Sequence, residues 1–312
     1  MIVNLIDGSN IFVICYSIVR KILLEQDGLT WKDQHRNLNR SDIKFLQKLF
    51  ITKTRLFINN KHNIICFEGT NSTKYRRDIY PAYKGNRPEK HPQFNELLNH
   101  CLDTLKYAPI KVMRVDDCEG DDCIYTLAKA FIEQHNAEVC IVSTDEDLTQ
   151  IATYWPNNVS VLHPIKKEIR EIDSNILLKK TLIGDSSDNI KFKNKLGPKT
   201  FEKMLEDVNV REKFLATKED YEAAENIRKI VDLRLYPYEF RKKIIDYYNS
   251  VDFYHPDKES IREFFHDDWA NINDLACIVA EYNRCRDEVV THLDYPDENE
   301  QIPTIFPWEI KK

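Results

Sequence analysis

Apolar runs and amphipathic stretches alternate along the first half of the chain. The runs IVNLI, NIICF and EVCIVS are short and rich in β-branched residues, which is typical of strands buried on both faces of a parallel sheet. Between such runs, apolar residues recur with helical spacing, most clearly over 10–26, 42–60 and 120–135. The alternation predicts an α/β fold up to about residue 165, with a central parallel sheet flanked by helices.

The pattern becomes helical and rich in Lys and Glu from about residue 174, and we expect no strand beyond about residue 170. The last residues combine an acidic, proline-containing stretch, DYPDENE, with an apolar tip, IPTIFPW. We therefore predict an α/β domain over 1–185, a helical region over 186–290 and a C-terminal tail over 291–312.

Acidic residues stand at the ends of the apolar runs. Because the carboxyl ends of parallel strands meet at one edge of a sheet, we expect these side chains to converge on one crevice. Crowded carboxylates repel one another, and hard cations such as Mg²⁺ or Mn²⁺, which prefer oxygen ligands, would neutralise them. The candidate metal ligands are Asp7, Glu68, Glu119, Asp121, Asp122, Asp145, Asp147, Asp185 and Asp188.

Each of these acids taken singly has a simpler explanation, because Asp after a strand often caps the next helix. The sequence DDCEGDD places five acids in seven positions, which capping seldom requires, so we favour a metal site. A zinc site is not expected, since the eight cysteines form no C-x-x-C pair and the nine histidines are scattered.

The formal net charge of −6 hides two basic segments. Residues 74–90 alternate cations with tyrosines on which bases can stack, and the spacing of Lys84 and Arg87 would place both on one helical face. Residues 191–203 hold a Gly-Pro turn before a helix, which can bind a phosphate through backbone N–H groups. Solvated surface charge and a plain helix start are the alternatives. The candidate DNA-binding residues are Lys74, Arg76, Arg77, Tyr83, Lys193, Lys195, Gly197 and Lys199.

Composition and hydropathy favour a cytoplasmic protein. We recognise no secretory signal, and the longest uninterrupted apolar run, IFVICYSIV, is far shorter than a membrane span, so no membrane partner is expected. Cysteines without a disulfide spacing indicate free thiols in a reducing compartment.

The motifs LIDGSN, FEG, YPAYKGNR, EGDD, STDEDLTQ and GDSSDNI occur in an order that resembles the phage branch of the 5′-nuclease (flap endonuclease) family, close to T-even phage ribonuclease H. The resemblance covers about residues 2–260. It implies a SAM-like or PIN-like nuclease domain, a helical arch over about 69–109 and a helix-hairpin-helix region that binds duplex DNA. It also places the nine acids on the family's metal-site positions, and Lys84 and Arg87 on its catalytic arch cations.

The resemblance implies a metal-dependent 5′ to 3′ exonuclease or flap endonuclease. The expected cofactors are two Mg²⁺ ions, for which Mn²⁺ substitutes, and K⁺ at the helix-hairpin-helix turn. The expected substrates are DNA with a 5′ flap or 5′ end and RNA–DNA hybrids, including RNA primers. Further expected partners are a single-strand DNA-binding protein and a sliding clamp, with the chain acting as a monomer in the host-cell cytoplasm.

Two other functions stay open from the sequence. A PIN-type single-strand ribonuclease would share the sheet and the acids but normally lacks the arch and the helical region. A non-catalytic protein that binds DNA junctions would keep the basic segments without needing every acid. The tail is also ambiguous: Gln301, Ile305, Phe306 and Trp308 resemble a clamp-binding peptide, yet the aromatic residues could instead pack onto the protein's own core.

Overall fold

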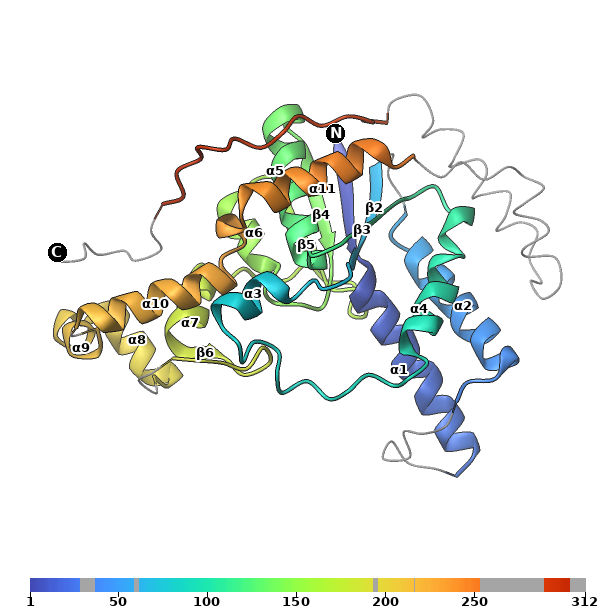
Figure 1. Cartoon of the computed structure of the whole chain (residues 1–312), viewed down its shortest axis with the longest axis horizontal. Coiled ribbons are helices and arrows are strands. Elements are labelled where there is room, and N and C mark those ends of the chain that lie inside the picture. The colour runs from blue at the N-terminus through green and yellow to red at the C-terminus, as the bar shows by residue number, and fades with distance from the viewer. Residues whose placement is uncertain (29–36, 59–61, 193–195, 216, 253–288, 304–312) are drawn as a thin grey trace.

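The computed structural model describes residues 1–28, 37–58, 62–192, 196–215, 217–252 and 289–303. At its centre lies a five-stranded parallel sheet of order β3-β2-β1-β4-β5 (Figure 1). The strands are β1 (Ile2–Asp7), β2 (His62–Glu68), β3 (Lys111–Val115), β4 (Glu138–Val142) and β5 (Val159–Leu162). The predicted α/β fold with a parallel sheet flanked by helices is confirmed.

Both faces of the sheet are buried, as the apolar runs predicted. Leu5 of β1 and Cys66 of β2 belong to one apolar core, and the adjacent Ile6 and Phe67 belong to the other. The first core is closed by α5 (Gly120–His135), α6 (Thr149–Tyr154) and α11 (Tyr238–Ser250), and the second by α1 (Gly8–Gln26), α2 (Arg40–Arg55) and α4 (Phe94–Leu102).

The chain reverses its direction across the sheet at β1. This central strand pairs with β2 on one side and with β4 on the other. In open α/β sheets such a reversal leaves a crevice at the carboxyl ends of the two strands, where ligands bind. Asp7 and Glu68 are the last residues of β1 and β2, so the topology places both at this crevice.

The segment between β2 and β3 contains α3 (Lys74–Ile79), a run of turns, α4 and the short helix η1 (Leu105–Tyr107). Lys84 and Arg87 lie in the turns, so the prediction that they share a helical face is wrong. Pro81 explains the difference, because a residue before proline is driven out of the helical region, and Tyr80 accordingly ends α3 in an extended conformation.

The helices from α7 (Ile176–Ile183) to α10 (Lys218–Val231) pack around a third apolar core. We call them the helical unit, which projects from one end of the sheet in Figure 1. This unit contains an antiparallel hairpin whose two strands have two residues each, so the expectation of no strand beyond residue 170 is wrong. The motif LIGDSSDNI forms this hairpin and does not extend the parallel sheet. Gly184, with φ 91°, allows the sharp turn from helix to hairpin. The elements between α7 and α10 are β6 (Gly184–Asp185), β7 (Ile190–Lys191), α8 (Pro198–Glu206) and α9 (Val208–Phe214). The short helix η2 (Leu233–Leu235) follows α10, and its Leu233 packs in the first core.

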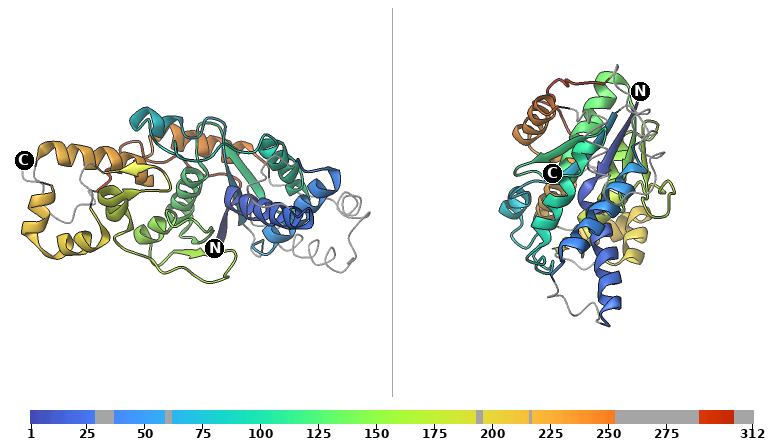
Figure 2. Two further views of the ribbon diagram at one scale, coloured as in Figure 1. Left: turned by 90° about the horizontal axis from the view of Figure 1, so that it is seen from below. Right: turned by 90° about the vertical axis from the view of Figure 1, so that its right-hand side faces the viewer.

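Residues 289–303 return along α11 and α5, as both views in Figure 2 show. Leu293 is 1% exposed, and Glu300 forms ion pairs with Lys129 of α5 and Arg241 of α11. Leu293 and Glu300 therefore attach this segment to the packed protein. The predicted clamp-binding residues Ile305, Phe306 and Trp308 lie outside the described residues. Within the described ranges, no helix combines the length and apolarity that crossing a membrane requires.

Candidate active site

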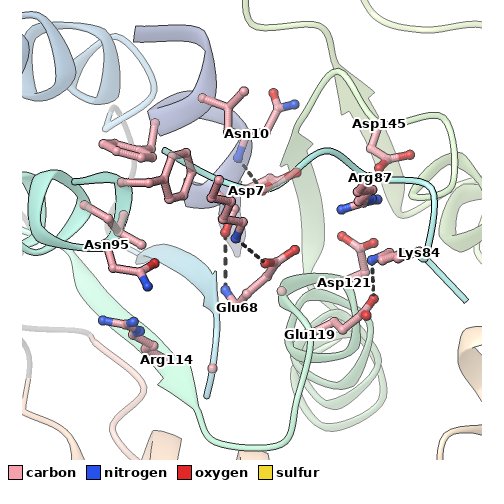
Figure 3. Close-up of a pocket in the computed structure, with 18 residues that line it drawn as sticks. Asp7, Asn10, Glu68, Lys84, Arg87, Asn95, Arg114, Glu119, Asp121 and Asp145 are labelled. Carbon is pink, nitrogen blue, oxygen red and sulfur yellow. Dashed lines mark hydrogen bonds and ion pairs between the residues drawn. The ribbon is translucent and has the colours of Figure 1, made fainter. Parts of the chain in front are cut away.

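A cavity of about 270 Å³ opens at the carboxyl ends of β1 and β2 (Figure 3). Five of the predicted metal ligands line it, together with Lys84 and Arg87. We call these five acids the cavity group: Asp7, Glu68, Glu119, Asp121 and Asp145. The topology thus collects acids that are far apart in sequence around one cavity.

Two glycines allow the backbone to place the first two acids. A Cβ on Gly8 would lie 2.4 Å from the Phe67 ring, so only glycine lets α1 start directly over β2 after Asp7. A Cβ on Gly69 would lie 1.8 Å from the Val115 carbonyl oxygen, so only glycine lets the chain leave β2 against the end of β3 after Glu68. The motifs LIDGSN and FEG therefore need their glycines for packing.

Hydrogen bonds fix Asp7 and the loop after β4. Asp7 accepts a hydrogen bond from the Asn10 backbone N–H (2.9 Å) and one from the Ser143 hydroxyl (2.7 Å). The side chain of Asn10 accepts from the Thr144 backbone N–H (3.1 Å), which ties α1 to this loop. Asp7 is therefore both the N-cap of α1 and a wall of the cavity.

The first turn of α5 separates three acids into two roles. Glu119 and Asp121 line the cavity, where the helix N-terminus favours negative charge. Asp122 does not line it: its carboxylate accepts two hydrogen bonds from Arg76 (2.8 and 2.6 Å) and one from the Glu119 backbone N–H (3.1 Å). The capping explanation is thus the better one for Asp122, and its predicted metal role is not supported by this geometry.

Arg76, the ion-pair partner of Asp122, is also not placed as predicted. Its side chain is buried, and it also lies 3.6 Å from Glu119 and donates to the Ile230 carbonyl. A buried guanidinium held by these groups is not available to a DNA phosphate, so the expectation that Arg76 contacts DNA is wrong. Instead it joins the start of α5 to the end of α10.

Lys84 projects into the cavity from the turn segment. Its Nζ lies 2.8 Å from Glu119, to which the Tyr83 hydroxyl also donates (3.1 Å). The backbone N–H of Lys84 donates to the Asp188 carbonyl (2.8 Å), so the β6–β7 hairpin holds the turn in place. Lys84 has φ 54°, an unfavourable value for a residue other than glycine, which shows that its surroundings fix this conformation. Tyr83 is buried behind it, so the expectation that Tyr83 offers a face to DNA bases is wrong.

Burial and mutual repulsion change the acidity of the cavity group. Burial, with contributions from Asp145 and Glu68, raises the pKa of Asp7 to about 6. Burial and the nearby Asp145 and Asp7 raise the pKa of Asp121 well above its usual value. Burial opposes ionisation of Glu119, but Arg76 and Lys84 prevail and lower its pKa. The cavity therefore resists the full negative charge of its own side chains.

The donor set fits a hard divalent cation. All five cavity acids offer oxygen ligands, which Mg²⁺ and Mn²⁺ prefer. The Oε1 atom of Glu119 is buried without a hydrogen-bond partner among the described residues, whereas its Oε2 atom is fully engaged. A buried carboxylate oxygen left unpaired in this way is costly unless a ligand completes it.

A second, more compact group of acids lies beside the cavity. Ligand oxygens of Asp147, Asp185 and Asp188 lie within 4.8 Å of one another, and we call these residues the flanking group. Lys180 forms ion pairs with Asp147 and Asp185, and Arg87 lies 2.8 Å from Asp188. Two cations of the protein thus neutralise most of this group.

Comparison with known proteins decides the family. Residues 3–181 match the family model described as the 5′-3′ exonuclease, N-terminal resolvase-like domain. The chain belongs to the 5′-3′ exonuclease family. The resemblance drawn from the sequence motifs is thereby confirmed.

Relatives in this exonuclease family include whole nucleases and parts of larger enzymes. Ribonuclease H of Enterobacteria phage T4 is 29% identical over 215 residues, which is 60% of this chain and 69% of that protein. DNA polymerase I of Bacillus caldotenax is 31% identical over 167 residues, which is 50% of this chain but only 19% of the polymerase. A solved structure of the bacteriophage T5 flap endonuclease, in a pseudo-enzyme-product complex with DNA and metal ions, has a TM-score of 0.52 at 15% identity and covers 91% of this chain and 100% of that one. This last likeness shows a shared fold.

The remaining predicted DNA-binding residues of this 5′-3′ exonuclease family member are mostly on the surface. Lys74 and Arg77 on α3 are exposed, although Lys74 pairs with Asp78. Gly197 and Lys199 are exposed at the start of α8, which begins close to the predicted position. Lys193 and Lys195 lie outside the described residues.

Sequence reasoning missed several residues of the site. Lys180 belongs to no motif that we used, and Ser143, although it opens the motif STDEDLTQ, was not singled out; the roles of both depend on tertiary contacts. Asn10 could have been found, because it stands three residues after Asp7 in LIDGSN, at the start of the same helix. The cavity also has a wall without acids, formed by Phe94, Asn95 and Leu98 of α4 together with Arg114. In Figure 3, Asn95 and Arg114 lie on the opposite side of Glu68 from Lys84.

Proposed function

We propose that this chain is a metal-dependent 5′ to 3′ exonuclease and flap endonuclease that hydrolyses phosphodiesters at 5′ ends, 5′ flaps and RNA primers. One observation carries the proposal: five acids from four segments of the chain surround one cavity into which Lys84 projects. Family membership supports it, since the matched region includes all of these residues. A ribonuclease of the PIN type or a non-catalytic protein is less well supported, because the acids, the turn segment and the helical unit occur together.

The residues would divide the chemistry between them. The cavity group would hold one Mg²⁺ ion and the flanking group a second, with Mn²⁺ as a substitute; bound there, such ions supply an activated water and stabilise charge on the phosphate oxygens. Lys84, whose side chain is buried, would place a positive charge beside the reacting phosphate, where it is worth more than in solution. Glu119 holds the Lys84 ammonium in position, and Arg87 lines the same cavity.

Substrate recognition in this proposal depends on the backbone of the nucleic acid. Lys74 and Arg77 are exposed on α3, beside the turn that carries Lys84, where they can contact phosphates of a strand entering the cavity. The exposed start of α8, with Gly197 and Lys199, can bind a phosphate of the duplex and is the position at which we propose a K⁺ ion. The substrate would therefore be selected by the shape of a junction and its free 5′ end.

A cleavage assay tests this function. A 5′-labelled flap, a nicked duplex and an RNA–DNA hybrid are incubated with Mg²⁺ and the products are sized on a gel. We expect Asp145→Asn to lower the cleavage rate by orders of magnitude. Lys84→Ala should lower the single-turnover rate by about 10²-fold, as is typical for the loss of one charge-stabilising group. Lys106→Ala is the matched control, because that lysine lies over Tyr107, away from the cavity. Wild-type rates in both site variants would rule out the assignment.

A sliding clamp and a single-strand DNA-binding protein are further partners that we propose. Deletion of residues 304–312 should remove stimulation by the clamp while leaving thermal stability intact. Deletion of 300–312 should also lower the melting temperature, because it removes Glu300 and leaves Lys129 and Arg241 without this partner. Equal clamp stimulation of the full chain and the shorter deletion would contradict a role for the tail.

A further inference from the structure

Lys180 of α7 lies between two acids of the flanking group. Its ammonium forms ion pairs with Asp147, in the loop after β4, and with Asp185, at the start of the hairpin. The Lys180 side chain is only 16% exposed, so the contact is shielded from water. Burial alone would lower the pKa of Lys180, but Asp147 and Asp185 raise it above its usual value, so this lysine is a permanent cation.

Lys180 contacts Oδ1 of Asp147 and Oδ2 of Asp185, which belong to two of the three carboxylates that a divalent ion would use. The ligand oxygens of Asp147, Asp185 and Asp188 lie within 4.8 Å of one another, which is a volume for one cation. Two cations held at the same pair of carboxylates would repel each other strongly in a partly buried site. A divalent ion can therefore take these oxygens only if the Lys180 ammonium moves away.

We propose that Lys180 is a tethered cation that competes with a divalent metal ion for the flanking group. The chain then binds one divalent ion tightly, in the cavity group, and a second one weakly, in exchange for the Lys180 ammonium. The inference rests on the metal sites of the proposed function, but it concerns ion binding and can be tested without cleavage.

Adjacent Lys179 shows that the arrangement is specific to one position. Lys179 pairs with Asp173 and lies 3.8 Å from Glu202, and its side chain is 35% exposed. The two lysines are consecutive on α7, so replacing either one removes the same charge from the same helix. Lys179 is therefore a matched control.

Binding of Mn²⁺ to the whole chain tests the proposal, measured by isothermal titration and by the electron paramagnetic resonance signal of free Mn²⁺. We compare the wild type with Lys180→Met, which keeps an apolar stem, and with Lys179→Met. We expect one tight and one weak site in the wild type and in Lys179→Met, and at least a tenfold tighter second site in Lys180→Met. An unchanged or weaker second site in Lys180→Met would overturn the proposal, because it would show that Lys180 only stabilises the fold.

Thermal unfolding with and without Mn²⁺ provides a second test, which can still be interpreted if removal of Lys180 destabilises the chain. Without metal, Lys180→Met should melt at a lower temperature than wild type, since its acids lose a cation. Saturating Mn²⁺ should raise the melting temperature of Lys180→Met more than that of the wild type, because a tighter ligand stabilises the folded state more. Lys180→Gln, which keeps a hydrogen-bond donor without the charge, should show the same larger rise; an equal rise in all chains would overturn the proposal.

The outcome is separable from the proposed nuclease function. A tighter second site in Lys180→Met together with no cleavage of flaps by the wild type would support the tethered cation and refute the function. Flap cleavage by the wild type, together with identical Mn²⁺ binding by the wild type and Lys180→Met, would support the function and refute the tethered cation.

Discussion

The cavity group and the flanking group are neutralised in different ways. In the flanking group the protein supplies its own cations, Lys180 and Arg87, and the carboxylate oxygens lie close together. In the cavity group Lys84 pairs with Glu119, but among the described residues no ion pair reaches Asp7, Asp121 or Asp145.

The pKa values of one acid in each group illustrate this difference. Burial raises the pKa of Asp7 to about 6, whereas hydrogen bonds from Lys180 and Ser187 overcome burial and lower the pKa of Asp185 to about 2. The cavity group thus holds carboxylates that the fold does not compensate, which is the arrangement of a site that awaits a cation. In the flanking group that compensation is already present at Asp185, whose ion pair with Lys180 would be exchanged for a metal ion.

The largest expected effect is on the cavity group. Asp121→Asn should lower single-turnover flap cleavage by about 10³-fold, which corresponds to roughly 4 kcal/mol in the barrier, while flap binding holds or tightens. The free energy of unfolding measured in EDTA should rise, because ionised Asp121 is disfavoured in the folded state. Asp116→Asn, at an exposed acid just before the same helix, is the control. Near wild-type cleavage by Asp121→Asn would refute its role.

The flanking group should respond in the opposite direction. Asp185→Asn leaves the buried Lys180 ammonium without one of its partners, so the free energy of unfolding in EDTA should fall by about 3 kcal/mol. Adding Lys180→Met to Asp185→Asn should cost less than the sum of the two single changes, because the second change removes the unpaired charge. Denaturant unfolding of the four chains measures this. A strictly additive result would mean that the pair is not coupled.

Much of this fold could be predicted from the sequence because its signals are local. The apolar runs of β1, β2 and β4 are buried on both faces, and helix α5 has the bounds that its periodicity gave. The acids could be found for the same reason, since each stands at the end of a run and the parallel sheet gathers these ends. Local pattern and topology were sufficient to place five acids at one cavity.

The sequence could not say which acids face the cavity and which face a cation of the protein. Asp121 and Asp122 are adjacent, and a difference of one residue in a helix turns their side chains by about 100°. Arg76 and Lys84 both belong to a basic segment, yet one is buried against Asp122 and the other lines the cavity. Such partners come from other elements, so charge patterning alone assigned Arg76 and Tyr83 to DNA incorrectly.

Stability without metal should depend on pH in opposite ways at Asp7 of the cavity group and Asp185 of the flanking group. The folded-state pKa of Asp7, about 6, exceeds its usual value of 3.8, so its contribution is most favourable at low pH and is lost as the pH rises from about 4 to 6. The pKa of Asp185, about 2, is below 3.8, so its contribution is present above that value and is lost as the pH falls toward 2. Burial and Asp145 raise the pKa of Asp147 to about 7, which extends the decline toward neutral pH despite Lys180.

Unfolding in EDTA between about pH 2 and 8 measures these changes in the free energy of unfolding, each roughly 2–4 kcal/mol. Asp7→Asn should flatten the decline between about pH 4 and 6, and Asp185→Asn should reduce the loss on the acid side. Saturating Mg²⁺ should reverse the decline above pH 4, since the metal binds the ionised carboxylates. A decline that is the same with and without Mg²⁺ would contradict a metal site in the cavity.

The smallest expected effect on stability is at Arg87, the second cation of the flanking group. Its side chain is 49% exposed, so the ion pair with Asp188 is screened by water and Arg87→Ala should lower the free energy of unfolding by less than about 1 kcal/mol. The loss should largely disappear in high salt, unlike that of Asp185→Asn, because salt screens exposed pairs more than buried ones. The loss of flap cleavage, expressed as a change in activation free energy, should exceed the loss in the free energy of unfolding, since Arg87 also lines the cavity. If Arg87→Ala destabilised the chain as much as Asp185→Asn, the surface cation would be the main partner of the flanking group, and the distinction between a buried, exchangeable Lys180 and an exposed Arg87 would fail.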